Sequence, residues 1–485
     1  MAHRNSGFFA SQSRNGDPSA DNSQSDQTSW NDSDPFWDQS DASWPSGFDP
    51  VGRTGGGWIA ALASVLPASS IPLAVQPTAF SAASSRVSSS GGLSATASVT
   101  AGWSNAAIAA DVANDLSAGS LGYSSVLSIL QDSAAGGMTA SKFSTLQALA
   151  AELNKPGGIS VSSYVQQITD DVVLGNSANA TWNGGSSTAA KLGNLSATST
   201  QAQVNELIGM WFQGTNLPSL NVSLLGEANY NPTYKTSTLS LYGPSGAPTD
   251  TDVSQGYLGD CYFLSSLGEV ALQDPTAIEN MITNNGNGTY GVRFYVNGQA
   301  DYVTVNEQLP VMGGGYRWAN GSTLEFANST TDNWVALVEK AYAQLNAQTN
   351  APHGMDLNSA SDSYAGIAAG TGSALTMITD QQESAIGLYS GESSSALASV
   401  LSSVTSSFKA GEEVLMSTSN SSSGNLVVDH MYMVTGVNAT TGALTIQNPW
   451  GSSYSGPLAM NFTETVQQLA AANCALWVTS GKAVG

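Results

Sequence analysis

Hydrophobic residues recur every three or four positions over roughly 104–215, the spacing of an amphipathic helix. The clearest stretches are 107–116, 143–153 and 204–212. Thr139 and Thr200 stand just before two of these stretches, where a side-chain oxygen can cap the first helical turn. The segment carries no paired catalytic acids, metal-ligand spacing or phosphate loop. We therefore expect a helical N-terminal region over 101–215 without a catalytic site of its own.

The pattern changes in the second half of the chain. Four prolines within 216–250 predict a linker. An apolar run at 262–271 follows a glycine-containing turn, which predicts a buried helix that begins at Cys261. Near the C-terminus, two runs of β-branched and apolar residues flank Gly442, which predicts an antiparallel hairpin.

Composition sets the first hundred residues apart. Residues 1–100 are rich in Ser, Asp, Asn and Gly, so we expect a disordered leader. Aromatic residues recur among its aspartates, a pattern that also fits a short interaction segment. The chain has 13 Lys+Arg against 36 Asp+Glu and a net charge of −23, which argues against nucleic acid and anionic membrane surfaces as partners. The apolar stretch 58–66 ends at Pro67 and is too short to span a membrane.

Chemically reactive side chains occur at particular points of this pattern. Cys261 opens the predicted helix, whose positive N-terminal end favours a thiolate. Gln255 lies six residues upstream on the same loop, where its amide could donate to a developing oxyanion. His430 and Asn448 lie on the two strands of the predicted hairpin, which could bring them side by side. A thiol, a base and a group that orients the base, in the order Cys–His–Asn, are the set that papain-like cysteine proteases use.

Other residues of the same types have simpler explanations. The second of the two cysteines, Cys474, lies in an apolar strand-like run, and we expect it to serve packing. With Cys261 as a nucleophile, no cysteine pair is left for a structural disulfide. Trp334, Tyr342 and Leu345 lie at helical spacing, and we expect them in a hydrophobic core.

Four segments, in this order, resemble the calpain family of cysteine proteases in its bacterial calpain-like branch. They are 252–264 (DVSQGYLGDCYFL), 333–343 (NWVALVEKAYA), 430–436 (HMYMVTG) and 448–451 (NPWG). The resemblance covers roughly 225–480, about half of the chain. It implies that Cys261 is the nucleophile, His430 the general base and acid, Asn448 the residue that orients the histidine, and Gln255 the oxyanion-hole donor.

The resemblance also implies a fold and a reaction. We expect an α+β fold, with a papain-like two-subdomain cysteine protease core, a helical N-terminal region and a disordered leader. Subdomain I, 216–385, is expected to be helical and to carry the cysteine. Subdomain II, 386–480, is expected to be β-rich and to carry the histidine and asparagine, with Trp450 beside the cleft. The implied reaction is hydrolysis of peptide bonds in protein or peptide substrates through a thioester acyl-enzyme, with no required cofactor.

Calcium is the one metal that the resemblance suggests. In the family, an acidic residue before the Gln-Gly turn and a glutamate of the Leu-x-Glu-Lys-Ala-Tyr helix share a calcium ion, and these positions match Asp252 and Glu339. Both offer the oxygen ligands that calcium prefers. The alternative is a solvated carboxylate, or a pairing of Glu339 with a nearby cation. The family's second calcium site needs several acids after 448–451, and the sequence SSYSGP at 452–457 argues against that site here.

Several alternatives stay open at this stage. Residues 1–225 are a candidate intramolecular pro-region, because they lie just before the nucleophile's domain. The rival functions are a catalytically inactive protease-fold binding module and a related Cys-His acyl transferase. The low Lys and Arg content and the lack of a signal-peptide pattern favour secretion by a non-classical bacterial route over a cytoplasmic location.

Overall fold

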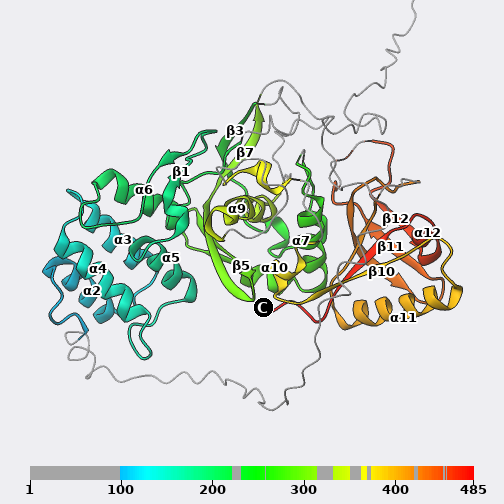
Figure 1. The fold of residues 1–485 in the computed structure, drawn as a ribbon, viewed down its shortest axis with the longest axis horizontal. Coiled ribbons are helices and arrows are strands. Elements are labelled where there is room, and N and C mark those ends of the chain that lie inside the picture. The colour runs from blue at the N-terminus through cyan, green and yellow to red at the C-terminus, as the bar shows by residue number, and fades with distance from the viewer. Residues whose placement is uncertain are drawn as a thin grey trace, which may run out of the picture. The chain divides into compact units, whose positions relative to one another are not determined.

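The computed structural model describes most of the chain beyond the leader. The described residues are 99–220, 231–256, 258–313, 331–349, 362–368, 373–419, 424–451, 454 and 456–484. Figure 1 shows their helices and strands, coloured from blue to red along the chain. The predicted disordered leader lies almost entirely outside these residues. Within the described ranges, no helix has both the length and the apolar character needed to cross a membrane.

Helices fill the N-terminal part of the described chain, as the hydrophobic pattern predicts. Side-chain oxygens of Asn105, Thr139 and Thr200 cap three of these helices by accepting backbone N–H bonds. The two predicted threonine caps are therefore confirmed, and α3 and α5 also lie within the predicted helical region. The helices are α2 (Ala106–Ala118), α3 (Tyr123–Ala134), α4 (Ala140–Leu153), α5 (Ser163–Val173) and α6 (Gln201–Trp211).

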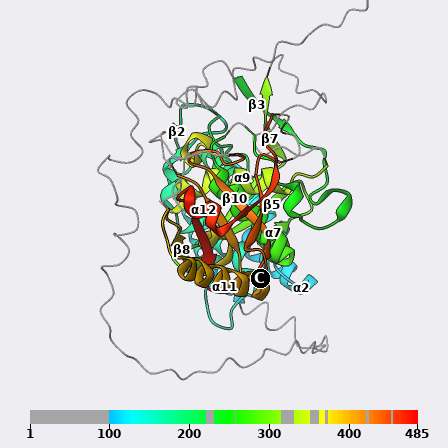
Figure 2. The same cartoon turned by 90° about the vertical axis from the view of Figure 1, so that its right-hand side faces the viewer.

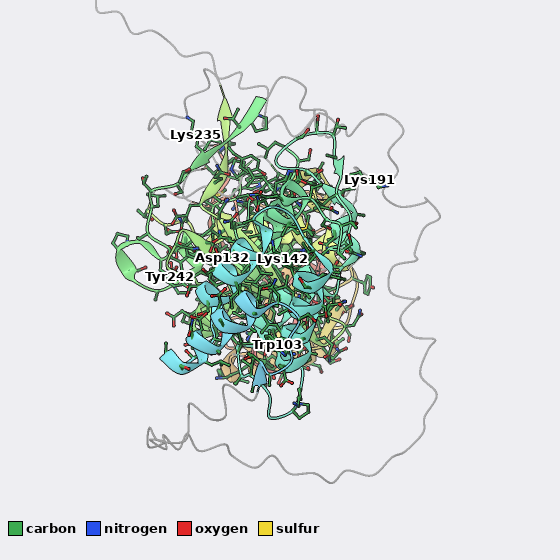
Figure 3. The ribbon with its side chains drawn as sticks, turned by 90° about the vertical axis from the view of Figure 1, so that its left-hand side faces the viewer. Trp103, Asp132, Lys142, Lys191, Lys235 and Tyr242 are labelled. Atoms are coloured by element: carbon green, nitrogen blue, oxygen red, sulfur yellow. The ribbon has the colours of Figure 1, made fainter. Side chains whose placement is uncertain are left out.

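A lysine ties the end of α3 to the start of α4. The Lys142 ammonium donates to the carbonyl oxygens of Ser133, Ala135 and Gly137, at 2.9, 2.7 and 3.0 Å. Carbonyls at a helix C-terminus lack partners within the helix, and a cation there is also favoured by the helix dipole. Figure 3 views the molecule from the side of these helices and labels Lys142 and the neighbouring Asp132.

A three-stranded antiparallel sheet lies within the part predicted to be helix-rich, in the order β4-β5-β6. Its strands are β4 (Ile282–Asn284), β5 (Thr289–Val296) and β6 (Gln299–Asn306). Asn297 and Gly298 connect β5 to β6, and both have positive φ, 53° and 72°. An Asn-Gly pair between alternating strands is a strong hairpin signal. The prediction of a helical subdomain I overlooks it.

The N-terminal helices pack against one face of this sheet. The Tyr164 hydroxyl on α5 lies 2.9 Å from Thr304 Oγ1 on β6, and Thr304 in turn donates to the carbonyl of Trp211 at the end of α6. Gly291 on β5 makes room for the tyrosine, because a Cβ at this position would lie 2.5 Å from its ring. The helical region is therefore joined to the sheet by buried polar contacts and by close packing.

A buried aspartate at this junction predicts that stability depends on pH. Burial raises the pKa of Asp171 on α5 to about 7 from an ordinary value of 3.8, and the nearby Asp301 contributes to the rise. The folded protein thus holds this proton more tightly than the unfolded chain. The stability contributed is complete below about pH 3.8 and is lost as the pH rises through about 7. We expect thermal unfolding at a lower temperature at pH 8 than at pH 5, with a smaller difference in Asp171→Asn; an unchanged difference would contradict the assignment.

The predicted linker contains regular structure. Residues Asn231–Thr236 form strand β3, which pairs antiparallel with β7 (Gln308–Gly313). A short 3-10 helix at Asp250–Asp252 follows before the Gln-Gly turn. The linker prediction is therefore wrong for these segments, because proline is compatible with a two-stranded sheet in which each strand has a free edge.

The hydrophobic core around the helix that begins at Cys261 is built from four helices and the inner face of the three-stranded sheet. The helix predicted to begin at Cys261 is confirmed as α7, and its side chains from Tyr262 to Ala271 are buried. Trp334, Tyr342 and Leu345 are also buried, as predicted, and the Tyr342 ring stacks on Phe263 at 3.9 Å between centroids. The four helices are α7 (Cys261–Gln273), α8 (Pro275–Met281), α9 (Trp334–Thr349) and α10 (Leu375–Thr379).

A six-stranded antiparallel sheet occupies the C-terminal part, in the order β12-β11-β10-β9-β13-β8. Its strands are β8 (Glu383–Gly387), β9 (Val414–Ser417), β10 (Met431–Asn438), β11 (Ala443–Gln447), β12 (Asn461–Thr465) and β13 (Ala475–Thr479). The predicted hairpin is confirmed as β10 and β11, with Gly442 at a φ of 72° in the turn. Because β8 begins at Glu383, the predicted boundary at residue 386 falls inside a strand.

Different helices cover the two faces of this sheet. Leu415, Met431 and Met433 contact the core around α7. Alternate residues such as Tyr432 face a separate cluster, formed with α11 (Ser394–Ala410) and α12 (Val466–Ala471). Figure 2 looks onto the side that carries α11 and α12. Cys474 is buried in this second cluster, which confirms the packing role predicted for it.

Candidate active site

Cys261 is the first residue of α7 and is half-buried. Burial raises the pKa of its thiol to about 12, and the nearby Asp260 adds to the rise. The backbone N–H of Met431 hydrogen-bonds to the sulfur and acts in the opposite direction. The expectation of a thiolate at the helix start is therefore not met, because desolvation of the charge outweighs the favourable end of the helix dipole.

His430 and Asn448 lie at adjacent ends of the hairpin, one just before β10 and the other just after β11. Their atoms Nε2 and Oδ1 are 2.9 Å apart. Asn448 Oδ1 also accepts the backbone N–H of Trp450 at 3.1 Å, which fixes the orientation of the amide. Since an amide oxygen only accepts, His430 must carry its proton on Nε2. This tautomer leaves the Nδ1 lone pair available to take a proton.

The environment of His430 favours a neutral ring. The side chain is buried, and burial lowers the pKa of its imidazole to about 4, while the bond to Asn448 acts in the opposite direction. Aromatic rings enclose it: Tyr432 meets it edge-on at 4.7 Å between centroids and Trp450 lies at 5.1 Å. A neutral imidazole has a free lone pair that can accept a proton, which an imidazolium lacks. Among the described side chains, no direct hydrogen bond joins His430 to Cys261.

Gln255 lies on a loop held against the segment after β11. Its backbone N–H donates to Pro449 O at 2.7 Å, and Ser254 Oγ donates to Trp450 O at 3.2 Å. Gly451 allows this approach, since it has a φ of 71° and a Cβ there would lie 2.6 Å from the carbonyl oxygen of the residue before Ser254. The structure therefore places the loop that leads to the cysteine next to the segment that carries Asn448.

The side-chain amide of Gln255 is engaged by its own loop. Nε2 donates to Leu258 O at 2.6 Å and approaches Asp260 Oδ1 at 3.4 Å. An amide nitrogen has two donor hydrogens, so both are directed at these oxygens. Gln255 would therefore have to release Leu258 O before it could donate to an oxyanion beside Cys261.

The two predicted calcium ligands have different partners. Asp252 Oδ2 accepts from Trp334 Nε1 at 2.9 Å and from the backbone N–H of Thr249 at 2.8 Å. Glu339 is fully buried, and its carboxyl group shares a hydrogen bond with that of Asp260, which requires a proton on one of the two. Calcium takes about six to eight oxygen ligands, and no group of three or more His, Cys, Asp or Glu in the described ranges is arranged to hold a metal ion. Because backbone carbonyls and waters can also be calcium ligands, calcium at Asp252 and Glu339 stays a prediction.

Asp260 is a site residue whose environment the sequence pattern does not indicate. It precedes Cys261, is fully buried, and burial raises the pKa of its carboxyl to about 7. The hydrogen bond to Glu339 places a second buried carboxyl group next to Asp260. The sequence signal that could have indicated this environment is an acidic residue directly before an apolar run. A buried acid needs a specific partner.

Known proteins with similar sequences agree on one family. Residues 236–471 match the sequence model described as calpain family cysteine protease. The calpain-type cysteine protease DEK1 of Zea mays is 29% identical over 235 residues, and ADL1 of Oryza sativa subsp. japonica is 30% identical over 235 residues. Each alignment covers 46% of this chain and 10% of the plant protein.

An animal relative matches a shorter stretch. The calpain-2 catalytic subunit of Rattus norvegicus is 29% identical over 156 residues, which cover 28% of this chain and 21% of that protein. The chain thus spans only about a tenth of the plant relatives and a fifth of this one. The match nevertheless includes the cysteine, the histidine and the asparagine described above. Residues 236–471 of this chain are thus a calpain family cysteine protease domain.

Proposed function

We propose that the chain is a calpain-like cysteine endopeptidase that hydrolyses peptide bonds through Cys261, His430 and Asn448. The observation that carries the proposal is the fixed orientation of the Asn448 amide. Because its oxygen accepts from both the Trp450 N–H and His430 Nε2, the free lone pair of the imidazole is on Nδ1. We further propose that the core around α7 and the cluster on α11 and α12 correspond to the two subdomains of a papain-like fold.

In the acylation step, His430 Nδ1 takes the proton of the Cys261 thiol as the sulfur attacks the carbonyl carbon of the substrate. A C–S bond forms and the carbonyl oxygen becomes an oxyanion. The backbone N–H of Cys261 at the helix start and the Gln255 amide, once it leaves Leu258 O, would donate to this oxygen. The C–N bond then breaks, the imidazolium protonates the leaving amine, and a thioester remains on Cys261.

In the deacylation step, the same imidazole acts on water. His430 Nδ1 removes a proton from the water molecule that attacks the thioester carbon. The C–S bond breaks, the acid product leaves and the sulfur regains its proton from the imidazolium. Asn448 keeps the ring in one tautomer through both steps without adding a charge.

Two other functions use some of the same residues. An inactive binding module would keep the fold without the reaction, and the oriented His430–Asn448 pair argues against it because such a module does not need a fixed tautomer. An acyl transferase would pass the thioester to an amine instead of water. Labelling of Cys261 by a thiol-reactive epoxide separates the module from the enzymes, and amine incorporation separates the transferase from the protease.

The decisive test is cleavage of casein by the full chain, with and without a calcium chelator. We expect cleavage that Cys261→Ala abolishes, because the proposed reaction forms its acyl-enzyme on the Cys261 sulfur. Cys474→Ala is the matched control, since its thiol is buried in a separate cluster and its loss should leave cleavage unchanged. Casein that stays intact with wild-type protein, at every calcium concentration, would refute the proposed activity. Loss of cleavage only with chelator would support the calcium prediction.

A further inference from the structure

One buried acid on the nucleophile's helix inserts between two strands of the large sheet. Glu269 on α7 is fully buried. Its Oε1 accepts the backbone N–H of Val414 at 3.3 Å, and its Oε2 accepts that of Val434 at 3.2 Å. Gln273, one turn further along α7, donates to Oε1 at 3.2 Å. A single carboxylate therefore bonds α7, β9 and β10 together.

The position of this carboxylate follows from the strand register. β9 and β10 pair as Met431 with Ser417, Tyr432 with Met416, and Met433 with Leu415. The next pair in this register would be Val434 with Val414. These are the two residues whose N–H groups the carboxylate accepts. The Glu269 carboxylate thus accepts two backbone N–H groups at the position directly beyond the last paired residues of β9 and β10.

The same face of α7 contacts β10 all the way to the nucleophile. Ser265 Oγ donates to Met431 O at 2.9 Å. Gly268 lets the helix approach, since a Cβ there would lie 2.2 Å from the Met433 sulfur. The sulfur of Cys261 accepts the N–H of Met431, the residue directly after His430. Cys261, Ser265 and Glu269 are spaced four residues apart, so they lie on one helix face.

We propose that Glu269 is a positioning residue for the reaction: it locks α7 to the strand that follows His430 and thereby sets the distance between the thiol and the imidazole. The proposal rests on the proposed protease function. Cys261 lies eight residues, or about 12 Å, from Glu269 along the helix axis. Without the Glu269 contacts, α7 is held to β10 only by the contacts of its first two turns. Small rotations of the helix then move the Cys261 sulfur relative to the His430 imidazole.

The chemistry of the side chain is specific. Burial raises the pKa of Glu269 well above its ordinary value. In either protonation state, both oxygens retain a lone pair for an N–H donor. A glutamine amide offers one oxygen and one NH2 group, and the NH2 would face the N–H of Val414 or Val434, donor against donor. Glu269→Gln therefore removes one of the two strand contacts while it keeps the size of the side chain.

A second buried glutamate provides a matched control. Glu413, just before β9, is also fully buried, but its carboxylate accepts from Thr479 Oγ1 at 2.6 Å and from the N–H of Ala483 at 3.3 Å. These partners lie in and after β13, so the hydrogen bonds of Glu413 do not join α7 to the sheet, although its charge acts on that of Glu269. Glu413→Gln should therefore lower the unfolding temperature without changing the position of the nucleophile.

The test compares the full-length wild type, Glu269→Gln, Glu413→Gln and His430→Ala. For Glu269→Gln we expect kcat for casein-derived peptides to fall between about 10- and 100-fold with little change in KM, because a misplaced nucleophile affects the chemical step. The second measurement is the rate at which iodoacetamide alkylates Cys261, followed by mass spectrometry of the peptide that contains it. In Glu269→Gln, the pH dependence of this rate should match that of His430→Ala. Glu413→Gln should keep the wild-type kcat and the wild-type alkylation profile.

Two outcomes would overturn the proposal. One is a Glu269→Gln variant that loses thermal stability but keeps the wild-type kcat and alkylation profile. The other is a Glu413→Gln variant that loses as much kcat as Glu269→Gln, since the effect would then follow stability alone. If wild-type protein does not cleave peptides at all, the protease function fails, and the alkylation profiles still decide whether Glu269 positions the thiol.

Discussion

Alanine in place of His430 is expected to lower kcat/KM for peptide hydrolysis by at least about a thousandfold. The reason is the state of the resting pair. Burial raises the pKa of the Cys261 thiol to about 12 and lowers that of the imidazole to about 4, so the sulfur is protonated at neutral pH and needs a base to become a nucleophile. No solvent base has the position of His430, which Asn448 holds at 2.9 Å. The measurement is kcat/KM on a peptide substrate, with folding checked by circular dichroism.

Two comparisons make this result specific. Asn448→Ala should cost less than His430→Ala, because the imidazole stays and loses only its fixed tautomer. In the wild-type pH profile of kcat/KM, the fall in activity at acid pH should lie well below 6.5, the ordinary pKa of histidine. Activity is lost only when the pH falls far enough to protonate the His430 ring, whose pKa is about 4. An acid limb near 6.5, or a His430→Ala variant with near wild-type rates, would show that the buried ring is not the base.

A chain that lacks residues 1–224 is expected to be much less stable than the full chain, and not more active. The N-terminal helices cover one face of the three-stranded sheet, where Tyr164 and Trp211 both contact Thr304. Their removal would expose this face and leave the Thr304 hydroxyl without its protein partners. Thermal unfolding and peptidase activity of residues 225–485 and of the full chain measure both effects. A shortened chain that keeps its unfolding temperature and gains activity would instead identify an inhibitory pro-region.

A single substitution addresses the same junction within the full chain. In Gly291→Val, the added side chain would meet the Tyr164 ring, from which a Cβ would already be only 2.5 Å away. Overpacking of this kind costs about 1–3 kcal/mol of unfolding free energy. Gly122→Val is the matched control, because a Cβ at that position meets no atom within 4 Å. Equal unfolding free energies for the two variants would argue against tight packing of the helices on the sheet.

Local signals predict much of this molecule. Thr139 and Thr200 cap helices because a side-chain oxygen can satisfy a free N–H wherever a helix begins, whatever surrounds it. The hairpin around Gly442 is likewise a short-range feature, and it places His430 beside Asn448 without further information. The helix start at Cys261 follows from the apolar run after a glycine turn.

Features that depend on distant partners are the ones that the pattern does not predict. The thiol pKa is set by burial beneath the β10 strand and not by the helix end alone. The role of Glu269 depends on its hydrogen bonds to β9 and β10, whose bonded residues lie about 145 and 165 residues later in the chain. The hairpin at Asn297 and Gly298 is different, since its signal is local and readable, but the expectation of a helical subdomain I passes over it.

The order of strands in the large sheet has a consequence for how the protein is made. β13 lies between β9 and β8, although it comes last of these strands along the chain. While a ribosome is still synthesising the chain, β9 presents an unpaired edge until residues 475–479 have emerged. The helix that bears the thiol is complete some two hundred residues before the sheet that supports its base. Synthesis itself therefore delays assembly of the reactive pair, and a nascent chain carries its cysteine without a finished catalytic partner.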